Sequence, residues 1–289
     1  MEPAISITGL TKRYASSVAV DRVAFQVENG EVFGILGPNG AGKTTTLEMI
    51  EGLRKPDEGE IRVLGEQVWP DPRRIQRKIG VQLQSTTLFD LLTARELLML
   101  FATFYNRPDA ERRADEVLGQ VGLETKSHDY AETLSGGQQQ RLAIALALVH
   151  DPEIVFLDEP TTGLDPQARR NLWDVIRAIN TDQRKTVVLT THYLEEAEEL
   201  CHRVAIMDSA RIVALDTPAG LIASLNADAR ISYTDEEGTH ALMVRDTQAA
   251  VLDVLEQARE RGATVRDLSV KGADLEDVFL NLTGREYRE

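Results

Sequence analysis

The sequence predicts an α/β fold, and two observations support this prediction. Short continuous runs of aliphatic and β-branched residues alternate with segments of helical periodicity. A glycine-rich loop joins the first of these apolar runs to a helical segment. Continuous apolar runs of this length suit strands that are buried on both faces, as in a parallel sheet. The chain is therefore expected to build a parallel sheet with helices between its strands.

The main sheet is expected to contain five strands. They are Glu31–Leu36, Lys78–Leu83, Glu153–Asp158, Thr186–Thr191 and Arg203–Asp208. Residues 1–30 instead suggest short antiparallel strands, with Asn29-Gly30 as a hairpin-type turn. Between about residues 89 and 150 the sequence is mostly helical, without a convincing strand, which predicts a helical subdomain inserted into the sheet domain.

A small α+β domain is expected at the C-terminal end. Residues 230–244 read as a strand, a Glu-Glu-Gly turn and a second strand, and a third strand follows the next helix. Residues 247–262 and 274–284 each place apolar side chains on one helical face and end at a glycine. We therefore divide the chain into a main domain at 1–225 and an accessory domain at 226–289.

Composition points to a soluble protein. The 289 residues are 42% hydrophobic and 27% charged, and no apolar run is long enough to span a bilayer. The N-terminus lacks the regions of a signal peptide, so a cytosolic location is expected, with any membrane role through a partner. The net charge of −15 argues against nucleic acid, because a phosphate backbone needs clustered Lys and Arg. The single cysteine, Cys201, excludes an internal disulfide and is expected to be buried.

The glycine-rich loop "GPNGAGKTT", Gly37 to Thr45, matches G-x-x-x-x-G-K-[ST] between a strand and a helix. Its glycines let backbone N–H groups close on a phosphate without Cβ clashes. Lys43 then brings positive charge to the β- and γ-phosphates of a nucleotide, and the Thr44 hydroxyl is a ligand for Mg²⁺. The competing interpretation is a glycine-rich turn capped by a helix.

Polar residues follow three later apolar runs. Asp158 stands where the Mg²⁺ ligand of a P-loop protein belongs, and Glu159 beside it can take a proton from an attacking water. By themselves these two residues could instead form a strand-end turn. His192 stands at the edge where open α/β sheets bind ligands, although a lone histidine is often a surface or core residue. Gln84, on its own, reads as a polar strand end.

A second anion-binding composition, "LSGGQ" at Leu134–Gln138, begins another helical segment. With the glycine-rich loop upstream and the two carboxylates downstream, it resembles the ATP-binding cassette (ABC) family of transporter ATPases. The resemblance covers about Ile5–Leu225, in the family's motif order. It implies a P-loop NTPase cassette with a RecA-like core, an N-terminal antiparallel β subdomain and an inserted helical subdomain.

The resemblance also implies roles for single residues. Tyr14 is the aromatic residue that stacks on adenine, and Gln84 senses Mg²⁺ and the membrane partner. Asp165 belongs to the D-loop, and His192 is the switch histidine. Tyr14 could instead pack at a strand end, and Asp165 with Pro166 is a natural helix N-cap and N1 pair.

Two cassettes of this family dimerise head to tail, so the signature "LSGGQ" of one chain caps the γ-phosphate held by the other. Ser135, Gly136 and Gly137 would then form the second wall of a shared ATP site. The implied catalytic residues are Glu159, His192 and Lys43, and the implied metal ligands are Thr44, Gln84 and Asp158. The implied nucleotide contacts are Tyr14, Gly37, Asn39, Gly40, Ala41, Gly42, Lys43, Thr44, Thr45, Gln84, Ser135, Gly136, Gly137, Gln138 and Asp165.

Residues 214–225 and 274–286 narrow the resemblance. They are similar to drug-resistance exporter ATPases, including daunorubicin-type systems, whose permease is a separate chain. We therefore expect the ATPase subunit of an ABC exporter, a homodimer that uses ATP and Mg²⁺ and is held at the inner face of the cell membrane by an integral membrane permease. The alternatives are an importer ATPase, a non-transport ATPase acting on ribosomes or DNA, and a non-catalytic nucleotide-gated regulator. The cargo, whether lipid, drug, peptide or ion, is left open.

Overall fold

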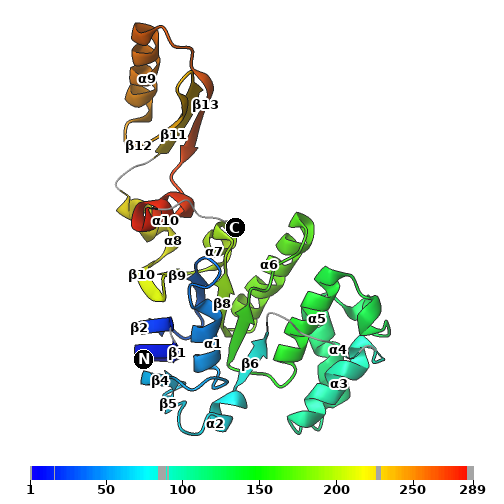
Figure 1. Cartoon of the computed structure of the whole chain (residues 1–289). Coiled ribbons are helices and arrows are strands. Elements are labelled where there is room, and N and C mark those ends of the chain that lie inside the picture. Colours follow the sequence, from blue (N-terminus) through cyan, green and yellow to red (C-terminus); the bar gives the residue numbers. More distant parts are fainter. Residues whose placement is uncertain (1, 16, 84–88, 90, 226–228, 285–289) are drawn as a thin grey trace. The chain divides into compact units, whose positions relative to one another are not determined.

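The main sheet contains the expected strands in the structure, a computed structural model that describes residues 2–15, 17–83, 89, 91–225 and 229–284 (Figure 1). They are β3 (Val32–Leu36), β6 (Ile79–Gln82), β7 (Ile154–Asp158), β8 (Thr186–Thr191) and β9 (Arg203–Asp208). These strands pair in parallel. The sheet order is β10-β9-β3-β8-β7-β6, with β10 (Arg211–Asp216) at one edge. The predicted α/β fold class is confirmed.

The strand order brings three loops to one edge of this sheet. β3 lies beside β8, and β8 lies beside β7, so their carboxyl ends are neighbours. Leu36 pairs with Thr191, and Asp158 pairs with Thr190. The glycine-rich loop follows β3 and leads into α1 (Lys43–Ile50). Residues far apart in the sequence therefore meet where open α/β sheets bind ligands.

A second, antiparallel sheet shares its apolar core with the main sheet. Its order is β2-β1-β4-β5, comprising β2 (Ser17–Val27), β1 (Ile5–Tyr14), β4 (Glu58–Val63) and β5 (Glu66–Gln67). Phe25 of β2 stacks on Phe33 of β3 with ring centroids 5.0 Å apart, inside the common core. This stacking fixes the antiparallel sheet beside the strand that precedes the glycine-rich loop.

The expectation of a hairpin at Asn29-Gly30 is wrong. These residues join β2 to β3, which belong to different sheets. Gly30 has a positive φ of 73° but Asn29 does not, whereas a type I′ hairpin turn needs a positive φ at both positions. The hairpin lies at the other end of β2, where Tyr14 of β1 pairs with Ser17.

Helices fill the segment assigned to the helical subdomain. α3 (Ala94–Phe104), α4 (Ala110–Gln120) and α5 (Gly136–Leu148) lie between β6 and β7 in the chain. Short 3₁₀ helices stand at Glu124–Lys126 and Ala131–Thr133. The other helices before residue 215 are α2 (Arg73–Gln76), α6 (Pro166–Thr181) and α7 (Leu194–Leu200).

The structure divides into two units, Met1–Leu215 and Asp216–Arg288. The second has an antiparallel sheet in the order β12-β11-β13, and α8 packs against α10. The boundary expected after residue 225 follows α8, whereas the division at Leu215–Asp216 precedes α8, because this helix packs against α10 in the second unit. The elements of this unit are α8 (Pro218–Ser224), β11 (Ala229–Asp235), β12 (Gly238–Val244), α9 (Thr247–Arg261), β13 (Arg266–Gly272) and α10 (Leu275–Thr283).

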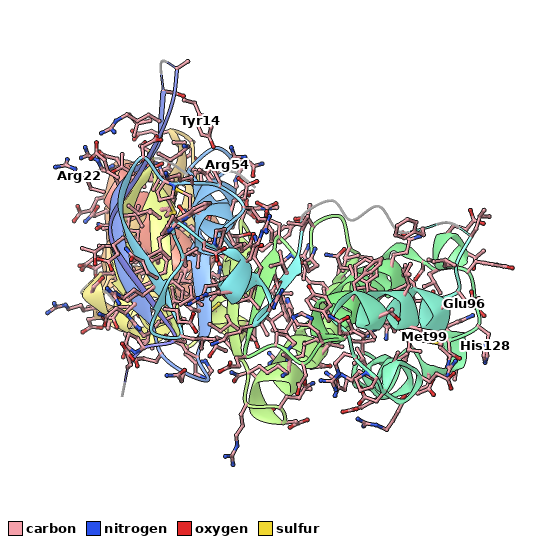
Figure 2. The ribbon with its side chains drawn as sticks, turned by 90° about the horizontal axis from the view of Figure 1, so that it is seen from below. Tyr14, Arg22, Arg54, Glu96, Met99 and His128 are labelled. Atoms are coloured by element: carbon pink, nitrogen blue, oxygen red, sulfur yellow. The ribbon has the colours of Figure 1, made fainter. Side chains whose placement is uncertain are left out.

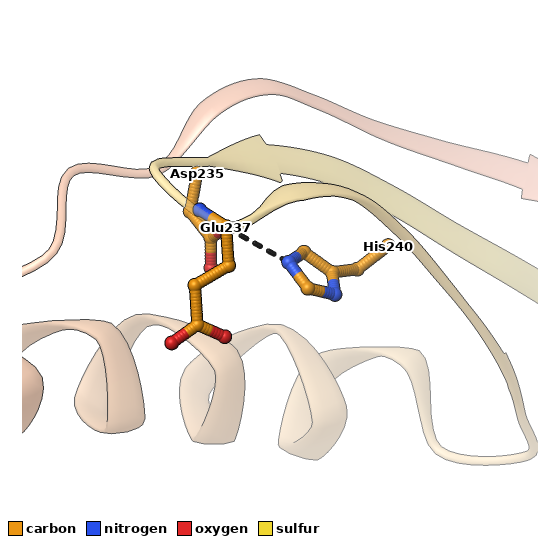
Figure 3. A group of neighbouring side chains, drawn as sticks. All are labelled: Asp235, Glu237 and His240. Atoms are coloured by element: carbon orange, nitrogen blue, oxygen red, sulfur yellow. Dashed lines mark hydrogen bonds and ion pairs between the residues drawn. The ribbon is translucent and has the colours of Figure 1, made fainter.

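Asp235 holds the turn between β11 and β12 (Figure 3). Its Oδ1 accepts hydrogen bonds from the backbone N–H groups of Glu237 (2.9 Å) and Gly238 (3.2 Å) and from His240 Nε2 (2.8 Å). The hydrogen bond from His240 is the main cause that lowers the pKa of Asp235. None of the helices in the described parts of either unit is long and apolar enough to cross a membrane.

Candidate functional site

The glycine-rich loop folds tightly around the start of α1. A Cβ at Gly37 would lie 2.3 Å from the carbonyl oxygen of Met207, and one at Gly42 would lie 2.3 Å from that of Ala19. Gly42 also has a φ of 107°, which residues with a side chain rarely adopt. The sequence argument attributed the glycines to the approach of a phosphate, and the structure adds a second cause, the close approach of the chain's own backbone.

The start of α1 suits an anion. Among the described residues, no side chain caps this helix, and its first turn holds no acidic residue. By contrast, α3, α5 and α6 begin with the capping side chains of Thr93, Ser135 and Asp165. A helix start without a cap leaves N–H donors unpaired and carries a partial positive charge. The residues present therefore fit a bound phosphate group.

Lys43 projects into the interior from this helix start, and its side chain is 4% exposed. Its ammonium group donates to the carbonyl oxygens of Gly37 (2.8 Å) and Pro38 (3.3 Å). It also forms an ion pair with Glu159 Oε1 at 3.1 Å. A buried ammonium group needs such partners because its desolvation is costly. The cation of the loop therefore lies directly against the carboxylate that follows β7.

Asp158, at the end of β7, is contacted by hydroxyl groups from two sides. Thr44 Oγ1 lies 3.2 Å from its Oδ1, and the Thr190 hydroxyl of β8 donates to the same oxygen. Burial raises the pKa of Asp158, these hydrogen bonds oppose the rise, and the adjacent Glu159 adds to it. A hydroxyl and a carboxylate are the hard oxygen donors that Mg²⁺ prefers, so Thr44 and Asp158 fit a metal site.

Glu159 is held by three side chains. Besides Lys43, His192 Nδ1 lies 3.0 Å from its Oε2, and the Thr162 hydroxyl donates to that oxygen at 3.2 Å. Burial favours a higher pKa for Glu159, but Lys43 and His192 together outweigh it and lower the pKa. The carboxylate is therefore ionised. Its backbone φ of 48° lies in the left-handed region, a strained conformation of the kind that clusters at functional sites.

These groups surround one cavity of about 440 Å³. Asp158 and His192 adjoin it through their contacts with Thr44 and Glu159. Gly37 and Ala41 are buried within the loop. The structure therefore brings together the predicted loop, both carboxylates and the histidine. The cavity is lined by Ala19, Asn39, Gly40, Gly42, Lys43, Thr44, Thr45 and Glu159.

Sequence reasoning missed three residues of this site: Ala19, Thr162 and Thr190. A hydroxyl residue near the end of "TVVLTT" could have been singled out, because that strand, like the one ending in Asp158, was expected to end where open α/β sheets bind ligands. Ala19 and Thr162 carry no such signal. Cys201 is 7% exposed, as expected, and burial raises the pKa of its thiol well above the ordinary value.

The signature and the D-loop residue border a different cleft, of about 210 Å³. Ser135 Oγ accepts from the N–H of Gln138 at 3.4 Å, and Gln138 Oε1 accepts from the N–H of Ser135 at 2.9 Å. Asp165 accepts from the N–H groups of Gln167 and Ala168, both at 2.9 Å. One chain thus keeps the two expected phosphate-binding elements apart. The cleft is lined by Ser135, Gly137, Gln138, Arg141, Asp165, Gln167, Ala168 and Asn171, while Gly136 is exposed at the start of α5.

One predicted nucleotide contact, Tyr14, lines neither cavity. Tyr14 ends β1 and is 37% exposed. Tyr14 and Arg54 lie close together (Figure 2). The ring centroid of Tyr14 is 5.4 Å from the Arg54 guanidinium and 5.8 Å from Lys12 Nζ. Of the described residues that line the 440 Å³ cavity, Ala19 of β2 is one and Tyr14 is not. Gln84 lies outside the described residues.

Comparison with known proteins gives concordant matches. The model of the ABC transporter family matches residues 20–162. The Nod factor export ATP-binding protein I of Paraburkholderia xenovorans (strain LB400) is 39% identical over 307 residues, covering 100% of this chain and 99% of that protein. The linearmycin resistance ATP-binding protein LnrL of Bacillus subtilis (strain 168) is 36% identical over 306 residues, covering 97% of this chain and 98% of that protein.

Solved structures agree with these matches. The dimeric, post-hydrolysis ATP-binding cassette MJ0796 bound to ADP and Pi is 32% identical, with a TM-score of 0.67 over 74% of this chain and 98% of that one. CbiO1 from Clostridium perfringens is 26% identical, with a TM-score of 0.73 over 78% of this chain and 92% of that one. The chain therefore belongs to the ABC transporter family, as an ATP-hydrolysing subunit of the exporter type.

Proposed function

We propose that two copies of this chain share two ATP sites, and that hydrolysis there drives a separate membrane permease in export. One observation carries the proposal: the glycine-rich loop and the signature of a single chain border different cavities, of about 440 and 210 Å³. The loop of one copy and the signature of the other would supply the two walls of one site. The dimeric form of the solved cassette MJ0796 supports this pairing.

The glycine-rich loop would bind the phosphates of ATP. The uncapped start of α1 offers N–H donors, and Lys43 offers a charge for the β- and γ-phosphates. Thr44 and Asp158 would hold Mg²⁺, which neutralises charge on phosphate oxygens when bound. The family resemblance adds Gln84 as a further ligand and the exposed Tyr14 as the adenine contact.

Glu159 is the proposed general base for the attacking water. Lys43 forms an ion pair with Glu159 Oε1 and lowers the pKa of this carboxylate. Phosphate oxygens would compete for the Lys43 ammonium group, and loss of that attraction would raise the pKa of Glu159. A carboxylate with a higher pKa takes a proton more readily. ATP binding would therefore prepare the base that its own hydrolysis needs.

The neighbours of Glu159 would orient it and stabilise charge. His192 and Thr162 both contact Oε2, which leaves Oε1 for the water once Lys43 turns to the phosphates. Lys43 and His192, with Ser135 of the second copy, would stabilise negative charge on the γ-phosphoryl group in the transition state. Each of these groups acts on an atom that changes charge during the reaction.

An apolar cavity of about 540 Å³ supports a permease as the membrane partner. It is bordered by residues of β6, α3 and α5 and by those that follow α1. Leu53, Leu83 and Phe89 on its border are 56%, 46% and 55% exposed. Contiguous exposed apolar surface marks protein interfaces. We propose that the integral membrane permease docks here and holds the chain at the inner face of the membrane. The relatives' names, which describe Nod factor export and linearmycin resistance, favour export over import.

The test mixes two disabled variants. Lys43→Ala removes the charge of the loop, and Gly136→Asp places a carboxylate where the signature should meet the γ-phosphate. Each variant alone should lack ATPase activity. A mixed dimer has one site with both walls intact, so mixing should restore part of the hydrolysis. The matched control mixes Lys43→Ala with the double variant Lys43→Ala, Gly136→Asp, which leaves no intact site in any pairing.

Dilution of the wild-type chain gives the complementary measurement. A site that needs two copies loses activity per chain once the protein is diluted below its dimerisation constant. Full activity per chain in a preparation that mass photometry shows to be monomeric would contradict the shared site.

A further inference from the structure

Helix α6 contacts the signature through its first turn. Asp165 caps α6 and borders the same cleft as Ser135 and Gln138. A Cβ at Gly137 would lie only 3.0 Å from the Cβ of Ala168, so this part of the signature fits closely against α6. The first turn of α6 therefore packs directly against the start of α5.

The next residues of α6 contact the segment that carries His192. The Arg169 guanidinium lies 4.0 Å from the ring centroid of Tyr193, in a cation–π contact. The ring of Tyr193 in turn lies 4.2 Å from that of His192. Trp173 stands four residues after Arg169, on the same helical face. One helix thus touches both the signature and the neighbourhood of the switch histidine.

A buried carboxylate completes this second contact. Trp173 Nε1 donates to Glu196 Oε1 of α7 at 3.1 Å, and Glu196 is fully buried. Burial raises the pKa of Glu196. Glu196 belongs to α7, which begins two residues after His192. A carboxyl group in the interior is costly unless it is hydrogen-bonded, so the bond from Trp173 holds the start of α7 to α6.

We propose that α6 couples the two ATP sites of the dimer. Two contacts, Trp173–Glu196 and Arg169–Tyr193, connect α6 to the segment that carries the switch histidine. The inference rests on the proposed function, in which each signature completes the site of the other copy. ATP at a chain's own loop displaces the Lys43–Glu159 pair and shifts His192. The two contacts transmit this shift to α6. The first turn of α6 then determines the position of the signature that completes the other ATP site. Glu196, Trp173, Arg169 and Tyr193 are therefore positioning residues.

The experiment measures steady-state ATPase activity against ATP concentration, with ATP affinity measured separately on the monomeric chain by equilibrium dialysis. Trp173→Phe keeps an aromatic ring but removes the donor to Glu196. It should lower kcat about tenfold and bring the Hill coefficient close to 1, with the monomer's Kd for ATP within about twofold of wild type. The matched control is Trp69→Phe, because the buried indole N–H of Trp69 has no hydrogen-bond partner among the described residues. Its kcat and Hill coefficient should equal those of wild type.

A second variant lies nearer the surface and does not depend on core packing. Arg169→Met keeps the aliphatic stem and removes the guanidinium from Tyr193, and it should lower the Hill coefficient in the same way. Arg170→Met, at the exposed next position, is its control. Combining Trp173→Phe with Glu196→Gln should cost less than the sum of the single losses, because both act through one hydrogen bond.

Three outcomes would overturn the proposal: a wild-type Hill coefficient of 1, unchanged kinetics in both Trp173→Phe and Arg169→Met, or kcat, ATP affinity and thermal stability falling together. The last pattern would show a merely structural role. None of these outcomes would alter the recovery of activity on mixing Lys43→Ala with Gly136→Asp, so the coupling and the shared site fail separately.

Discussion

Helices α1 and α5 both begin in glycine-rich sequence, but their first turns differ in hydrogen bonding. Within the described residues, α1 has no capping side chain and places a buried lysine at its first position. α5 begins with a capping box in which Ser135 and Gln138 satisfy each other's backbone. The start of α1 therefore needs an anion to satisfy its donors, whereas the start of α5 is complete without one. On the proposed function, this difference distinguishes a helix start that would bind ATP within one chain from one that would act only when a second copy presents it.

The comparison implies that hydrolysis depends on the groups beside the start of α1, where Glu159 contacts Lys43. The variant Glu159→Gln tests this implication. The variant should bind ATP but hydrolyse it roughly a hundredfold to ten-thousandfold more slowly, because an amide cannot accept the proton of the attacking water. Single-turnover hydrolysis measures the effect. Glu153→Gln, at an exposed position before β7, is the control and should match wild type. Turnover of Glu159→Gln within threefold of wild type would show that another group is the base.

The far end of α1 extends the comparison. Glu51 caps it and is 2% exposed, and burial, followed by Asp158 and Glu48, raises the pKa of its carboxyl to about 8. The folded chain holds this proton more tightly than the unfolded chain. Stability is therefore present below pH 4.5, the ordinary value, and is lost as pH rises toward 8.

Glu51→Gln should remove this pH dependence, because the amide keeps the shape and cannot ionise. The free energy of unfolding in urea should rise by on the order of 3 kcal/mol at pH 8 and change little at pH 4.5. Glu132→Gln, at an exposed position, should show neither effect. An equal change for Glu51→Gln at both pH values would mean that the carboxyl does not titrate in this range.

The two helix starts should also differ in their effect on ATP binding by the monomeric chain. Lys43→Ala removes a charge-assisted contact and should weaken binding roughly tenfold to a hundredfold. Ser135→Ala should change monomer binding by less than about twofold but lower the kcat of the dimer. Equilibrium dialysis and steady-state kinetics report the two quantities. Equal losses of monomer affinity in both variants would remove the distinction between the helices.

The smallest effect is expected at Asp165, where the cap of α6 can be separated from a role in catalysis. Asp165→Ala should cost about 1 kcal/mol of stability, and Asp165→Asn should retain most of it, because Asn also caps helices. Thermal unfolding of both variants measures this difference. If the residue acts mainly as a cap, the ATPase activity of Asp165→Asn should stay near wild type. A similar loss of activity in both variants would assign the carboxylate charge itself a role in turnover.

The strands of the main sheet and the helical insertion were predictable because each is encoded locally. A continuous apolar run such as Thr186–Thr191 needs burial on both faces, whichever strands become its neighbours. The hairpin predicted at Asn29-Gly30 was wrong, because a turn sequence does not indicate whether the flanking strands belong to the same sheet. The sequence argument placed the boundary near residue 225, after α8, because it could not show the packing of α8 against α10, a contact between segments distant in the sequence.

The site was predictable in its motifs and less so in its contacts. The loop, Asp158, Glu159 and His192 were found because each follows an apolar run at the carboxyl edge of the sheet. The Lys43–Glu159 ion pair was not predicted, because nothing in either motif specifies which group the lysine side chain contacts. Glu196 lies in "LEEAEEL", a run that reads as a solvated helix face, and only the tertiary fold shows that it is buried.

The Lys43–Glu159 pair also bears on nucleotide affinity. A ligand that must first separate a buried ion pair binds more weakly, by the fraction of molecules in which the pair is open. On the proposed function, the β- and γ-phosphates of ATP would both draw Lys43 away from Glu159, whereas ADP lacks the γ-phosphate. The chain's own carboxylate would therefore compete with nucleotide for the lysine, and more effectively with ADP than with ATP.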